Sequence, residues 1–185
     1  MIRPFATVAL RTLAASMPGL VLAATLSVTP AMALGEKASV EIKDRAGKIL
    51  GIVELIETMA GVLMMVRLKG LPPGTHGFHF HDTGRCEGDF SSAGAIYNPL
   101  GAKHGFLNEE GPMAGDLSNL VVGPSGEVDV ELLSPFVTLN KAAEESLFDA
   151  GGSSLVVFEK ADDHQSEPEG GAGARIACGI VTPAR

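Results

Sequence analysis

Basic residues are scarce in this sequence, which has 14 lysines and arginines against 22 aspartates and glutamates and a formal net charge of −8. A surface that binds nucleic acid needs a basic face, and neither the charge balance nor any cluster of lysines and arginines supplies one. We therefore expect no nucleic-acid partner. Internal repeats are also lacking, and 185 residues suit a single domain.

Cysteine is equally scarce, since Cys86 and Cys178 are the only two in the chain. In an oxidising compartment, such a pair is most simply one structural disulfide. The alternative is two buried free thiols.

Helical periodicity is lacking as well, which favours an all-β fold. After residue 33, apolar residues alternate in short runs that end at glycine, proline, asparagine or aspartate. About seven or eight such runs are typical of a β-sandwich or barrel. Two polar, glycine-rich segments, 82–119 and 161–174, interrupt them, and we expect long functional loops there, although the second has the composition of a mobile linker. The expected strands lie within residues 38–45, 48–57, 61–70, 71–84, 120–133, 153–160 and 175–181. Gly123-Pro124-Ser125-Gly126, inside the fifth of these segments, is expected to form a hairpin turn.

The first 33 residues are typical of a secretory signal peptide. They contain Arg3 and Arg11, no acidic residue, an apolar middle and a final Ala-Met-Ala. Cleavage after Ala33 would leave residues 34–185 as one domain, in the periplasm or secreted, with no membrane attachment. The alternative is a membrane anchor, but a proline and a glycine interrupt the apolar run that a spanning helix needs.

Four residues are candidates for binding a metal. His79 and His81 lie two apart in an expected strand, so both imidazoles project from one face. Two ring nitrogens on one face can chelate a metal, although a polar strand face is the other interpretation. His104 and Asp116, in the first long loop, add a third imidazole and a carboxylate, and neither is diagnostic alone.

Six segments of the chain, taken in order, form a recognisable set of motifs: HGFHFHDTGRC, SSAGAIYNP, the Lys103-His104-Gly105 step, GPMAGDLSN, FEKADD and GAGARIACGIV. Together they resemble the copper/zinc superoxide dismutases, and the resemblance is to the bacterial periplasmic type. It covers nearly all of the mature chain. It implies an all-β fold, an eight-stranded Greek-key β-barrel or sandwich, immunoglobulin-like, with two long functional loops.

The resemblance also implies a metal site that is incomplete. In that family, one histidine bridges copper and zinc, three more complete the copper site, and two histidines and an aspartate complete the zinc site. By this resemblance, His79 and His81 match copper ligands, and His104 and Asp116 match zinc ligands. Apolar residues replace histidine at the other three of the seven positions: Ile96 (bridging), Met113 (zinc) and Phe158 (copper).

The missing ligands change the expected metal chemistry. Two histidines alone favour Cu(I), which accepts two or three donors, over Cu(II), which prefers four. A structural zinc site needs four ligands, so we expect no tight zinc binding. Met113 either fills an apolar gap or serves as a soft thioether ligand for copper.

Other features of the family are kept. Cys86 and Cys178 match its intramolecular disulfide, and Arg175 matches the arginine that guides superoxide towards copper. Asp162 matches a carboxylate that links two metal-site histidines, and we expect it to keep only one partner here, His104.

Three functions are consistent with this sequence. The first is a periplasmic superoxide dismutase-like protein with little or no dismutase activity that holds copper, with a copper-handling protein as its partner. The second is an active dismutase whose atypical copper site is completed by solvent, Met113 or a partner chain, and a homodimer is one such assembly. The third is a metal-free binding or assembly module. Three apolar replacements argue against the second function, and the retained His79 and His81 favour the first over the third.

Overall fold

The computed structural model describes residues 35–184, so the predicted signal peptide and its cleavage site lie outside the described residues. Strands are the main regular elements of residues 35–184. None of these residues belongs to a helix long and apolar enough to cross a membrane. The elements are β1 Lys37–Asp44, β2 Ile49–Thr58, β3 Gly61–Lys69, β4 Gly74–His76, β5 Phe78–His81, the 3-10 turn η1 Ser91–Ala93, β6 Leu120–Val122, β7 Glu127–Ser134, β8 Ser154–Phe158 and β9 Arg175–Pro183.

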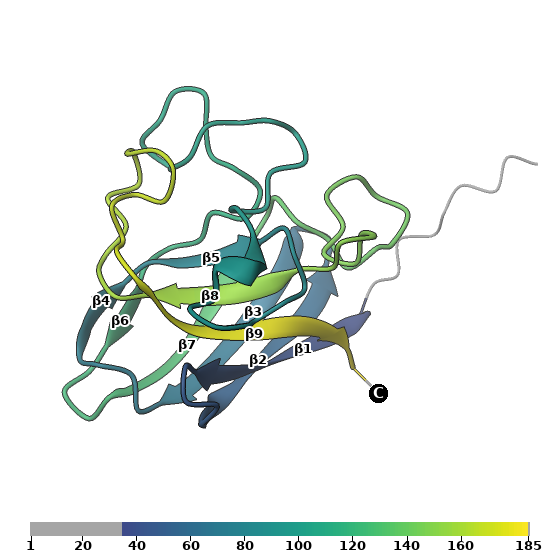
Figure 1. Ribbon diagram of the computed structural model, residues 1–185. Coiled ribbons are helices and arrows are strands. Elements are labelled where there is room, and N and C mark those ends of the chain that lie inside the picture. The colour runs from purple at the N-terminus through teal and green to yellow at the C-terminus, as the bar shows by residue number, and fades with distance from the viewer. Residues whose placement is uncertain (1–34, 185) are drawn as a thin grey trace, which may run out of the picture. The chain divides into compact units, whose positions relative to one another are not determined.

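Seven of the strands form one antiparallel sheet in the order β5-β8-β9-β1-β2-β3-β7, and β4 and β6 form a second, two-stranded sheet. The large sheet curls, so that β8 and β9 lie in front of β3 in Figure 1. β1, β2 and β3 follow one another as hairpins, and β9 returns to lie beside β1, an arrangement of the Greek-key kind. β4 and β5 are separated only by Gly77, and counting them as one strand gives eight. The predicted all-β class is confirmed.

The main core lies on the concave side of this sheet. Buried residues alternate along β1, β2 and β3, with Val62, Met64, Val66 and Leu68 of β3 all inside. This is the period of two that strands impose on side chains. β8 is buried on both faces, because Leu155 and Val157 join the main core while Val156 and Phe158 belong to a second cluster.

The second cluster is small and lies beneath the long loops. Its members are Phe90, Ala93, Val156, Phe158, Ala172 and Cys178. The disulfide between Cys86 and Cys178, with an S–S distance of 2.01 Å, joins the first loop to β9 at this cluster. The sequence prediction of one disulfide is therefore confirmed, and the free-thiol alternative is wrong.

Candidate metal centre

The two histidines predicted to bind copper lie side by side on β5. His79 and His81 are both fully buried, and their ring centroids are 6.4 Å apart. β8 pairs with one edge of β5, and the first long loop covers the other edge through bridges from Asp116 to His79 and from Ile96 to His81. The loop is thereby fixed against the strand, and two of the predicted site positions lie beside the two histidines.

In each of these rings, one nitrogen forms a hydrogen bond and the other has no hydrogen-bond partner. His79 Nε2 donates to Asp162 Oδ2 at 2.9 Å, and His81 Nδ1 donates to the carbonyl oxygen of Gly94 at 3.1 Å. A neutral imidazole has one N–H donor and one acceptor nitrogen. The acceptors, His79 Nδ1 and His81 Nε2, are buried and have no hydrogen-bond partner.

Phe158 packs directly against both histidines. Its ring centroid lies 5.1 Å from that of His79 and 5.8 Å from that of His81, and it is fully buried. Burial, together with the nearby positive charge of Arg175, lowers the pKa of His81 to about 3. His81 is therefore a neutral ligand-type imidazole with an apolar ring beside it.

Arg175 lies over the same site, but its guanidinium is occupied. It is 5.8 Å from the centroid of the Phe158 ring. It donates to the carbonyl oxygens of Phe90 at 2.9 Å and Gly94 at 2.8 Å, and it forms an ion pair with Glu169. Sequence analysis did not identify Glu169, which lies in a polar Glu-Pro-Glu step. This ion pair reduces the positive charge that Arg175 presents to an approaching anion.

His104 and Asp116, which match zinc ligands of the family, hydrogen-bond to each other. His104 Nδ1 lies 2.8 Å from Asp116 Oδ1, and His104 Nε2 lies 3.1 Å from Asp162 Oδ1. Burial lowers the pKa of His104, but the hydrogen bonds to Asp116 and Asp162 outweigh it and raise the pKa to about 10. The protonated ring thus carries a positive charge between two carboxylates.

Asp162 has two histidine partners, so the expectation that it would keep only His104 is wrong. Its carboxylate accepts from both His79 and His104. Burial raises the pKa of Asp162, but the hydrogen bonds from His104 and His79 outweigh it and hold the pKa well below its usual range. Asp162 has both contacts because position 79, unlike the three replaced ligand positions, is a histidine.

The donors of this region differ in how well they fit a metal ion. The buried group His79, His104 and Asp116 has ligand atoms within 4.8 Å of one another. However, both ring nitrogens of His104 and one of His79 already face carboxylates, and Asp116 Oδ2 accepts from the backbone N–H groups of Gly105 and Met113. His104 and Asp116 supply only two of the four ligands that a structural zinc site needs, whereas the unpartnered nitrogens of His79 and His81 are of the type that binds copper.

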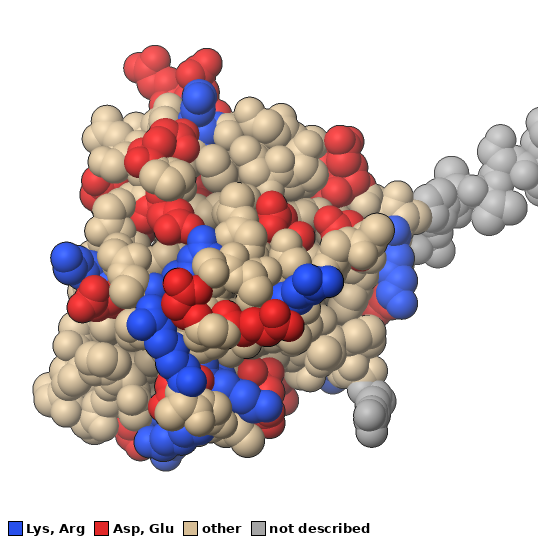
Figure 2. All heavy atoms as spheres, in the orientation of Figure 1, with Lys and Arg blue, Asp and Glu red and all other residues tan. Residues whose placement is uncertain are grey.

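Two of the replaced positions line a hollow of about 340 Å³ beside the site. Ile96 is almost fully buried, and Met113 lies with it in the wall. The same wall contains three carboxylates, Asp82, Asp149 and Glu169. Figure 2 shows one face of the protein, on which acidic side chains predominate over the upper loops and most lysines and arginines lie lower, over the sheet.

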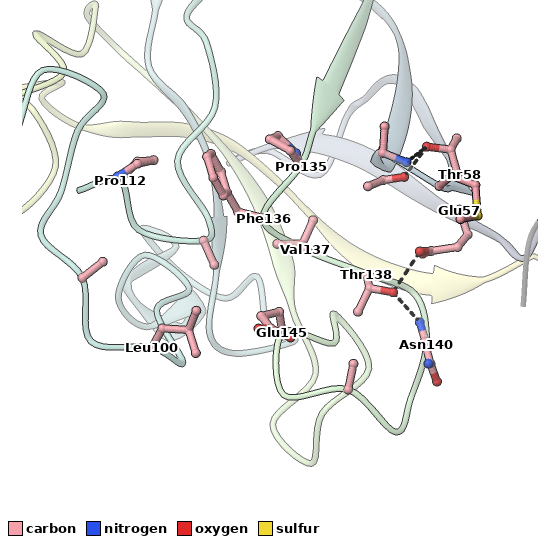
Figure 3. A pocket seen from close by; sticks show the side chains of 16 residues that line it. Glu57, Thr58, Leu100, Pro112, Pro135, Phe136, Val137, Thr138, Asn140 and Glu145 are labelled. Carbon is pink, nitrogen blue, oxygen red and sulfur yellow. Dashed lines mark hydrogen bonds between the residues drawn. The ribbon is translucent and has the colours of Figure 1, made fainter. Parts of the chain in front are cut away.

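A hollow of about 540 Å³ that none of the candidate metal ligands lines lies between the β2–β3 turn and two loops (Figure 3). Its buried carboxylate, Glu57, accepts from Thr138 Oγ1 at 3.0 Å and from the backbone N–H of Leu139 at 2.6 Å. Glu57 is therefore occupied in fastening a loop, and the candidate metal ligands lie elsewhere.

Comparison with known proteins supports the resemblance found in the sequence. The family model for copper/zinc superoxide dismutase matches residues 49–181. The copper-zinc superoxide dismutase 2 of Aquifex aeolicus is 43% identical over 167 residues, which cover 89% of this chain and 98% of that protein. The superoxide dismutase-like protein YojM of Bacillus subtilis is 41% identical over 145 residues, 77% of this chain and 74% of that protein.

Solved structures give the same result. A double mutant of a superoxide dismutase-like protein from Bacillus subtilis, with two introduced histidines, matches with a TM-score of 0.75 and 41% identity, covering 77% of this chain and 95% of that one. The copper/zinc superoxide dismutase from Brucella abortus matches with a TM-score of 0.65 and 31% identity, covering 78% and 99%. The shared fold, the family match and the retained site positions agree, and this chain belongs to the copper/zinc superoxide dismutase family.

Proposed function

We propose that this chain is an exported superoxide dismutase-like protein that binds one copper ion, as Cu(I), between His79 and His81 and has little or no dismutase activity. It would serve in copper handling in the periplasm or outside the cell, with a copper-handling protein as its partner. The observation that carries the proposal is the pair of buried, unpartnered nitrogens, His79 Nδ1 and His81 Nε2.

These two nitrogens are suited to bind a soft cation, because each has a free lone pair. Their lone pairs are fixed because the other nitrogen of each ring donates to Asp162 or to the Gly94 carbonyl. A buried acceptor without a donor costs about 1–3 kcal/mol, and a bound cation would remove that cost at both rings. Bound copper would supply one-electron redox chemistry, and two nitrogen donors in apolar surroundings favour its reduced state.

Three features argue against efficient turnover of superoxide. Phe158 and Ile96 occupy positions where a complete site has donors, and both are buried. Arg175 is paired with Glu169, so its attraction for an anion is reduced. The hollow beside Ile96 is lined by carboxylates, which repel superoxide and attract cations.

Copper binding can be tested by titrating purified residues 34–185 with Cu(I) against a chromogenic Cu(I) chelator. We expect one equivalent to bind. His79→Gln and His81→Gln each remove one of two donors, so each should weaken binding by more than the roughly 10- to 100-fold that loss of a supporting residue costs. The control is Lys48→Gln, which changes an exposed side chain in the turn between β1 and β2 and should leave Cu(I) affinity unchanged.

Superoxide clearance by the copper-loaded protein distinguishes this proposal from the alternatives. The reference is the triple variant Ile96→His, Met113→His and Phe158→His, in which zinc binding and dismutation should appear together. Clearance by the unmodified protein at the rate of the triple variant would make it an active dismutase with an atypical site. Failure to bind Cu(I) at all would favour a metal-free binding or assembly module.

A further inference from the structure

We propose that Asp116, His104 and Asp162 form a metal-free clamp, which fastens the first long loop to the loop of residues 159–174 at the positions that match zinc ligands. The clamp goes beyond the proposed copper function, because none of its three members supplies either of the nitrogens assigned to copper.

The clamp is complete in its hydrogen bonds. Both ring nitrogens of His104 face carboxylate oxygens, at 2.8 Å and 3.1 Å. Asp116 Oδ2 accepts from Gly105 N at 2.7 Å and from Met113 N at 2.9 Å, and Asp162 Oδ1 also accepts from His164 N at 2.6 Å. The ring of His104 lies between the two carboxylates, so both of its buried nitrogens have a hydrogen-bond partner without a metal ion.

Zinc binding at these positions would break the hydrogen bond between His104 and Asp116. Both His104 Nδ1 and Asp116 Oδ1 would have to face the ion, whereas in this structure they form a hydrogen bond with each other. The position that would supply another histidine holds Met113, and the bridging position holds Ile96. Two of the four ligands that zinc needs would not compensate for the loss of these buried hydrogen bonds.

The two loops that the clamp joins also contact each other through other hydrogen bonds. Leu107 N donates to the carbonyl oxygen of His164 at 2.9 Å, and His104 N donates to Glu167 Oε1 at 3.0 Å. At Gly105 the approach is so close that an added Cβ would lie 2.1 Å from the His164 carbonyl oxygen. Hydrogen bonds on both sides of His104 therefore close the loops without a metal.

Amide hydrogen exchange tests the clamp in the full mature protein. With EDTA present, the amides of Gly105, Met113 and His164, which donate to the two carboxylates, should exchange slowly, and one equivalent of zinc should leave their rates unchanged. His104→Gln should speed their exchange at least tenfold. Asp116→Asn keeps an acceptor oxygen for Gly105 and Met113 but loses the charge facing His104, so it should speed exchange by less.

The matched control is Lys103→Gln, which alters the exposed neighbour of His104 and should exchange as the unmodified protein does. Amides of β2 and β3 report whether each variant is folded. Fast exchange in EDTA that becomes slow on addition of zinc would overturn the proposal, because the cluster would then be a zinc site. Unchanged loop exchange in folded His104→Gln would also overturn it.

Discussion

The imidazole of His104 should make the stability of the protein depend on pH. Its pKa in the folded state is about 10, above the ordinary histidine pKa of 6.5. A raised pKa stabilises the fold fully below the unfolded value, and this contribution is lost as the pH rises through the folded value. We expect the free energy of unfolding, measured by urea denaturation, to fall between pH 6.5 and pH 10, by up to about 1.4 kcal/mol per pH unit.

The same measurement on His104→Gln provides the comparison. Glutamine does not titrate, so the variant should be less stable at pH 6.5 and should lose less stability towards pH 10. An equal slope in both proteins would assign the pH dependence to other groups and contradict the charge placed on His104.

Strand alternation was enough to place His79 and His81 on one buried face, because the period of two is a local property. It could not show that Asp162 binds both His79 and His104. That arrangement depends on contacts across 83 and 58 residues of sequence. The pairing of Arg175 with Glu169 was hidden for a different reason, since a glutamate in a polar loop looks like any solvated side chain.

Among the elements, turns were easier to predict than strand partners. The segment 123–126 forms the predicted turn, with Gly126 N donating to the carbonyl oxygen of Gly123 at 2.9 Å. However, the predicted hairpin is wrong in its pairing, because β6 pairs with β4 and β7 pairs with β3. Turn residues determine the local backbone, whereas β7 follows the longer apolar strand β3 over eight residue pairs.

The contact between the two long loops at Gly105 can be tested by adding one methyl group. Gly105 has a φ of +100°, and an added Cβ would clash with the backbone of His164. Gly101 has a φ of +69° and open space around it. Gly101→Ala should cost about 1–2 kcal/mol of unfolding free energy through backbone strain alone. Gly105→Ala should cost roughly 1–3 kcal/mol more through overpacking.

Thermal and urea denaturation of the two alanine variants would measure this difference. Equal costs would mean that the loops separate easily at Gly105, and the close approach would then contribute little to stability. A larger loss in Gly105→Ala would show that the contact between the loops is part of the cooperative fold.

Across the whole molecule, the fold could be predicted because its signals are repeated: alternating strands, turn residues and a pair of cysteines all point to a β fold with one disulfide. The site could be predicted only as a set of positions. The arrangement of side chains in the site depends on how Phe158 packs against two histidines and on how the second cluster packs beneath the loops. Such packing is set by side chains from several distant segments, and composition carries little information about it.

The disulfide connects these parts and should carry a large share of the stability. Cys86 and Cys178 are 92 residues apart, and Cys178 is buried in the second cluster, where it lies opposite Val156 of β8. Closing a loop of this length stabilises the fold by about 4–5 kcal/mol, because it restricts the unfolded chain. For a chain of this size, Cys86→Ala with Cys178→Ala should lower the melting temperature by about 10–15 °C. The unmodified protein under reducing conditions is the control, since it loses the bond and keeps both side chains, and calorimetry should give both a similar loss. A reduced protein that melts within a degree or two of the oxidised one would mean that the first loop is held by its packing on β5 and β8 instead.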